Sequence, residues 1–101
     1  MRVEGIAARG HTPLYVACQK GHLDVVRALL GADGIQANQA KNDGVTPLSV
    51  SCQVGHVEVV RLLLTVPGID VEKGQAGWPP LKLAQHFGHS EVVSILQEFS
   101  Q

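Results

Sequence analysis

The chain has 101 residues, with eight basic and nine acidic side chains, and its formal net charge is −1. This length is enough for one domain or for a small array of repeating units. The charges are scattered along the chain, so no basic surface for nucleic acid or for an anionic membrane is expected. The apolar stretches are only a few residues long, and the first residues show no signal-peptide pattern. We therefore expect a protein of the cytoplasm or the nucleus.

A sequence pattern recurs three times along the chain. Thr12-Pro13-Leu14 returns 34 residues later as Thr46-Pro47-Leu48, and 33 residues after that, in altered form, as Pro79-Pro80-Leu81. The pairs that keep the same register are Gly21-His22, Gly55-His56 and Gly88-His89, then Val25-Val26, Val59-Val60 and Val92-Val93. Because several independent positions share one register, the sequence predicts three repeats within a single domain, over about 7–40, 41–73 and 74–101.

Each repeat is predicted to form two short helices. Thr12 can cap the first helix and Pro13 fits its first position, while Gly21 suits the left-handed conformation that ends a helix. The second helix carries an acid, Asp24, in its first turn, close to the positive end of the helix dipole. Its spacing of apolar residues predicts a broad buried face. In the first repeat that face consists of Val25, Val26, Leu29 and Leu30.

The second repeat resembles a known family. Its run Gly44-Val45-Thr46-Pro47-Leu48, followed by Gly55-His56-Val57-Glu58-Val59-Val60, is similar to the ankyrin repeat, and the resemblance covers about residues 7–99. It implies an all-α fold, an α-solenoid of three helix–turn–helix repeats with extended hairpin-like loops. The family's histidine after Thr-Pro-Leu is replaced by Tyr15, Ser49 and Lys82. Ties between neighbouring loops must then be made by other groups or be weaker.

The two ends of the array differ in polarity. Three positions that are apolar in the first two repeats become Gln85, Ser90 and Gln97 in the third, as expected of a C-terminal cap. On the N-terminal side Val16, Ala17 and Val25 stay apolar, and residues 1–8 are too few for a helical cap. The chain is interpreted either as a piece of a longer array or as an array whose first repeat contacts another chain. We favour the first interpretation, because uncapped arrays tend to be insoluble.

The histidines and cysteines are explained by the repeat rather than by a catalytic or metal site. Equivalent side chains in stacked repeats lie roughly 10 Å apart, too far to share a zinc ion or to form a disulfide. Cys18 and Cys52 are therefore expected to be free, buried and inert. No catalytic, cofactor-binding or metal-binding motif is recognised, so we predict a protein that is not an enzyme and has no cofactor.

The ankyrin resemblance implies a protein partner that binds to the loop tips and the inner face of the first helices. The variable positions there are Arg9, His11, Asn42, Asp43, Val45, Gln75 and Trp78 beside the loop glycines, with Gln19, Lys20, Gln53, Val54, His86 and Phe87 closing the first helices. Tyr15 joins them from the first repeat. Trp78 is interpreted either as a partner anchor or as a structural side chain over the adjacent loop. For Phe87 contact with a partner is favoured, because Lys20 and Val54 replace it in the other repeats.

Two functions compete at this point. The first is a protein-interaction module, or a segment of one, whose partner the sequence does not name. The alternative is a structural or self-associating array that is joined through the N-terminal repeat face.

Overall fold

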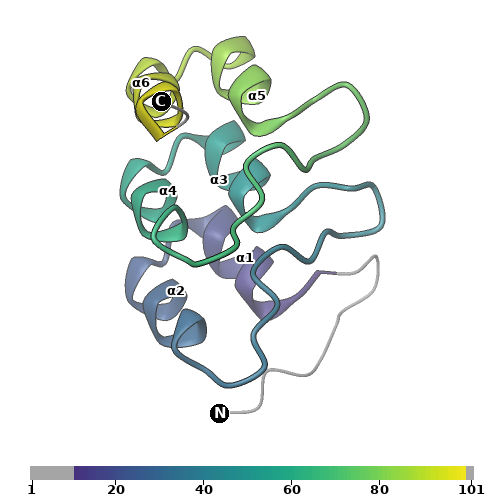
Figure 1. Cartoon of the computed structure of the whole chain (residues 1–101), viewed down its shortest axis with the longest axis vertical. Helices are drawn as coiled ribbons and strands as arrows, with labels where there is room; N and C mark the ends of the chain where they lie inside the picture. The colour runs from purple at the N-terminus through teal and green to yellow at the C-terminus, as the bar shows by residue number, and fades with distance from the viewer. Residues whose placement is uncertain (1–10, 100–101) are drawn as a thin grey trace.

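The computed structural model describes residues 11–99, and within them the chain forms six α-helices and no β-strand (Figure 1). These are α1 (Pro13–Lys20), α2 (Leu23–Leu30), α3 (Pro47–Val54), α4 (Val57–Leu63), α5 (Pro80–His86) and α6 (Ser90–Phe99). Helices α1, α3 and α5 pack in one layer, and α2, α4 and α6 in the other. The predicted all-α solenoid of paired helices is confirmed. None of these helices has the length and apolar character needed to cross a bilayer.

The first helices begin and end where the sequence pattern predicts. The Thr12 side chain accepts a hydrogen bond of 3.0 Å from the Tyr15 N–H, and Pro13 opens α1. α3 begins in the same way, whereas α5 begins after Pro79 and has no side-chain cap. Gly21 ends α1 with φ 73°, a left-handed conformation that favours glycine.

The apolar core lies between the two helix layers and between successive repeats. Val26, Val60 and Val92 are fully buried, as predicted for the second helices. Val25 was predicted to be buried, and that prediction is wrong, because its side chain is 46% exposed. Its counterpart Val59 lies on α4, which packs against α2 of the preceding repeat, whereas no helix among residues 11–99 precedes α1 and α2.

A histidine links each repeat to the one before it. Nε2 of His56 donates to the Gln19 carbonyl oxygen at 3.0 Å, and Nε2 of His89 donates to the Gln53 carbonyl oxygen at 2.9 Å. The imidazole also fills the space beside the preceding glycine: a Cβ atom on Gly55 would lie 2.5 Å from Nδ1 of His89. These contacts fix the register between neighbouring repeats.

The loops are tied to one another by groups other than the family's histidine. The Ser49 hydroxyl donates to the Lys73 carbonyl oxygen at 3.0 Å. Further out, the Asn38 amide donates to the Gly68 carbonyl oxygen at 2.9 Å, and its oxygen accepts from the Asp70 N–H at 2.8 Å. Ser49 thus replaces the expected imidazole with a shorter side chain that reaches the next loop directly.

The two ends of the stack show the expected contrast. Gln85, Ser90 and Gln97 are all exposed at the C-terminal end. At the other end an open hollow is lined partly by Val16, His22 and Val25. The third repeat therefore presents polar side chains to solvent, and the first presents apolar ones.

Both cysteines are free and completely buried in the core. Burial raises the pKa of each thiol from 9.0 to about 12, and for Cys18 a hydrogen bond with Ser51 acts in the opposite direction. Because the pKa is higher in the folded protein, the stability contributed by the neutral thiols is fully present below about pH 9. It is lost as the pH rises toward 12.

Replacing His89 with alanine should lower the free energy of unfolding by about 1–2 kcal/mol, because the Gln53 carbonyl loses its partner. The measurement is equilibrium unfolding in urea. His22→Ala is the matched control: it changes the same position of the first repeat, for which residues 11–99 show no equivalent bond. The control replacement should lower the free energy of unfolding by less than about 0.5 kcal/mol. Equal losses in the two variants would contradict the linking role.

The thiols of the folded protein should be almost unreactive toward a thiol-specific reagent at pH 8, where a pKa of about 12 leaves about one thiolate in ten thousand. Labelling followed by mass spectrometry should accelerate with urea in step with unfolding measured by circular dichroism. Rapid labelling of either cysteine in the folded protein would show that the position opens locally.

Candidate functional site

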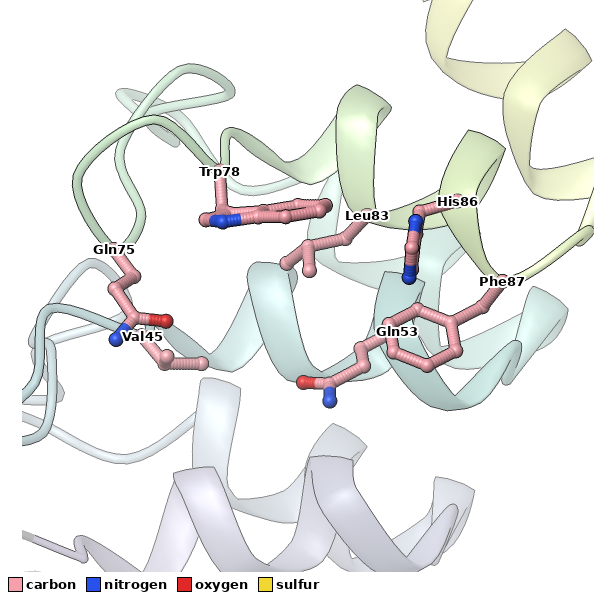
Figure 2. Close-up of a pocket in the computed structure, with 7 residues that line it drawn as sticks. All are labelled: Val45, Gln53, Gln75, Trp78, Leu83, His86 and Phe87. Carbon is pink, nitrogen blue, oxygen red and sulfur yellow. The ribbon is translucent and has the colours of Figure 1, made fainter.

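Two loop tips and two first helices enclose a hollow of about 200 Å³ (Figure 2). Its lining comes from the loop before α3 (Val45), the loop before α5 (Gln75 and Trp78), α3 (Gln53), α5 (Leu83 and His86) and the residue that follows α5 (Phe87). We call this site the Trp78 hollow. It brings together six of the residues that the sequence predicts for partner binding.

The Trp78 indole is held in place from several sides. The backbone N–H of Trp78 donates to the Gln75 carbonyl oxygen at 2.8 Å, which closes the loop tip. The ring meets the His86 imidazole edge-on, with centroids 5.0 Å apart, and the Lys82 ammonium lies 4.9 Å from its centroid. The cation–π contact and the edge-to-face pair both favour this orientation of the indole. The indole therefore packs on side chains of its own repeat, and it also presents a surface to the hollow.

The opposite wall of the hollow is an exposed aromatic ring. Phe87 is 48% exposed and meets His86 edge-on at a centroid distance of 4.8 Å. Figure 2 shows Trp78 and Phe87 on either side of Leu83, with His86 between them. Leu83 and Val45 are only 8% and 7% exposed, so they supply an apolar floor. The amides of Gln53 and Gln75 complete the lining with hydrogen-bonding groups.

Two of the residues predicted in the first repeat, His11 and Tyr15, form a separate cluster with Lys41. His11 stacks on Tyr15 with centroids 5.2 Å apart, and the Lys41 ammonium lies 5.9 Å from the Tyr15 ring. Tyr15 was expected on the exposed face, but it is only 4% exposed, and burial raises the pKa of its hydroxyl despite the nearby Lys41. Because so little of its surface is accessible, Tyr15 belongs to the core rather than to a contact surface.

The loop tip before α3 carries a paired acid. Asp43 lies 2.9 Å from the Lys41 ammonium, and its other oxygen accepts from the Val45 N–H at 3.1 Å. Desolvation is the largest single influence and would raise the pKa of this carboxyl, but the hydrogen bonds from Lys41 and the Val45 N–H, together with the Lys41 charge, outweigh it, so the pKa is lowered. Asn42 beside it is exposed. This tip is therefore a hydrogen-bonded turn in which the negative charge of Asp43 is already paired with Lys41.

The other predicted residues lie outside the Trp78 hollow. Gln19 and Lys20 are exposed at the end of α1, and Val54, at the end of α3, is 45% exposed. Arg9 lies outside the residues that the structure describes. We call the loop tips together with the C-terminal ends of α1, α3 and α5 the finger face. That a partner contacts the residues of the finger face stays a prediction.

The sequence pattern did not identify Leu83, which lines the hollow, or Lys82, which contacts the Trp78 ring. Leu83 has the apolar character of a core residue and corresponds to Val16 and Val50, so nothing in the pattern separates it from the core. Lys82 was noted only as a replacement for histidine. The spacing of four residues between Trp78 and Lys82 was the one indication of this contact. Because Trp78 lies in the loop before α5, the spacing alone does not show that the two side chains meet.

No group of three histidine, cysteine, aspartate or glutamate side chains within residues 11–99 is arranged to hold a metal ion. His11 and His86 instead contact aromatic rings, and His56 and His89 bind backbone carbonyls. What the Trp78 hollow offers is an apolar floor, two aromatic walls and two amides. That combination suits non-covalent recognition.

Comparison with known proteins agrees with this architecture. A family model described as ankyrin repeats in three copies matches residues 2–75 and 34–101. No curated protein matches the chain. Since the two matched ranges together span nearly the whole sequence and the helices pair and stack as that family requires, this chain belongs to the ankyrin repeat family.

Proposed function

We propose that this ankyrin repeat domain is a non-catalytic module that binds a protein partner through its finger face. Ankyrin repeats are generally protein-binding modules. The observation that carries the proposal for this chain is the Trp78 hollow, where an exposed phenylalanine and a fixed indole flank an apolar floor. Aromatic side chains in this setting are the usual hot spots of protein interfaces.

The size of the hollow supports a protein partner over a small molecule. Pockets for cofactors and drug-sized ligands have volumes of about 300–1,000 Å³. The Trp78 hollow measures about 200 Å³ and is open to solvent, which suits one side chain of a larger partner. Its lining contains no carboxylate, cysteine or serine that could serve as a nucleophile.

Replacing Trp78 and Phe87 together with alanine should weaken partner binding by more than about 2 kcal/mol, or roughly thirtyfold, because both aromatic walls are lost. The measurement is capture of partners from a lysate of the native cells, followed by titration of the captured protein. Circular dichroism should show that the array stays folded.

Phe99→Ala is the matched control for this experiment. Phe99 is 46% exposed, almost the same as Phe87, but it lies on α6 in the other helix layer. Its replacement should leave binding unchanged. If the double variant binds as tightly as the natural sequence, the two aromatic residues have no part in recognition.

A second function, self-association through the first repeat, has one observation in its favour. Val25 is 46% exposed beside the hollow that Val16 and His22 also line. An apolar face of this kind can be covered by another chain. Under this alternative, Val25→Glu should abolish an oligomer that light scattering detects at high concentration. A strict monomer at high concentration would rule this function out.

A further inference from the structure

We infer that the finger face binds an extended peptide segment carrying two apolar side chains and one carboxylate, spaced about three residues apart. This inference rests on the proposed function and specifies the chemistry of the partner. It follows from three features of the described residues: a row of equivalent positions, the distribution of acids, and the amides beside the Trp78 hollow.

The first feature is a row of three side chains at the ends of the first helices. Lys20, Val54 and Phe87 occupy the same position in successive repeats, and all three are exposed. Since α1 packs on α3 and α3 on α5, neighbours in the row are separated by the distance between packed helices, about 8–10 Å. The row therefore presents one cationic and two apolar contacts at regular intervals.

The second feature is the segregation of the acidic residues. Helices α1, α3 and α5 contain no aspartate or glutamate, whereas Asp24, Glu58 and Glu91 lie on the second helices, where arginines pair with them. The loops between repeats carry the further acids Asp33, Asp70 and Glu72. On the described loop tip before α3, Asp43 is paired with Lys41. Lys20 is exposed and belongs to none of the ion pairs among the described residues, so its ammonium can meet a carboxylate of the partner.

The third feature is the pair of amides that flank the apolar part of the Trp78 hollow. Gln53 and Gln75 each offer a donor and an acceptor beside it. An extended backbone has free N–H and C=O groups that these amides can bind, whereas the backbone of a helical partner is already paired. The amides therefore favour an extended segment.

The spacing of the partner's side chains follows from these features. In the polyproline II conformation an extended chain advances about 3.1 Å per residue and makes one turn in about three residues. Side chains three residues apart therefore lie on the same side, and their separation of about 9 Å matches one step of the row. One apolar side chain enters the Trp78 hollow against Phe87, and a second, about three residues away, contacts Val54. A carboxylate about three residues beyond that meets Lys20.

The test is selection from a library of random 12-residue peptides against the whole chain, with the Trp78→Ala/Phe87→Ala protein as background. Enriched peptides should contain two apolar residues about three positions apart and an acid about three positions further on. On Lys20→Gln the acid preference should disappear, and on Lys20→Glu it should change to lysine or arginine. Arg27→Gln removes the same charge from the other helix layer and should leave the preference intact.

Affinities can then be measured with synthetic peptides that lack tryptophan, because Trp78 is the only tryptophan and its fluorescence reports on the hollow. At low ionic strength, changing the peptide's acid to its amide should weaken binding to the natural sequence about three- to fivefold, and should have no effect on Lys20→Gln.

The outcomes separate this inference from the proposed function. If lysate partners depend on Trp78 and Phe87 but the acid preference persists in Lys20→Gln, the inference is overturned and the binding module stands. Apolar residues enriched about seven positions apart would indicate a helical partner, and would overturn the extended segment. If neither peptides nor lysate partners respond to the double replacement, both proposals fail.

Discussion

The structure depends on one constraint, which is that a pair of short helices cannot bury its own apolar face. Each pair in this chain completes its core against the next one, and the histidine bonds from His56 to the Gln19 carbonyl and from His89 to the Gln53 carbonyl set the register of that stacking. Because the register is fixed, the loop tips and the ends of the first helices line up on one face. The Trp78 hollow is a product of this alignment, since its lining comes from two adjacent repeats.

Most of the fold was readable from the sequence because its determinants are local and periodic. Thr-Pro pairs, glycines at helix ends and paired valines act within a few residues, and three copies reinforce one another. The exception, Val25, belongs to an acid-Val-Val motif that recurs in all three repeats, and it differs from its counterparts in what covers it. Burial by a neighbouring repeat is a property of position in the stack, and a pattern that repeats identically cannot encode it.

The candidate site was readable only in part. Six residues of the Trp78 hollow could be named because they occupy positions that vary between repeats, but their grouping depends on side-chain directions that periodicity does not give. Leu83 was missed because it has core chemistry, and Tyr15 was expected on the contact surface although its ring turns inward beneath His11 and Lys41. An aromatic residue in a variable position can thus lie either on the contact surface or in the core, depending on whether the neighbouring loop covers it.

Gln19 and Gln53 each serve two purposes with different atoms. Their carbonyl oxygens belong to the main chain and accept the histidine bonds, while their side chains remain on the finger face. Any amino acid supplies the same carbonyl, so these positions are free to drift in evolution without loosening the stack. An array built in this way can acquire a new binding partner while keeping its architecture, and the same freedom makes these two sites natural starting points for retargeting the domain.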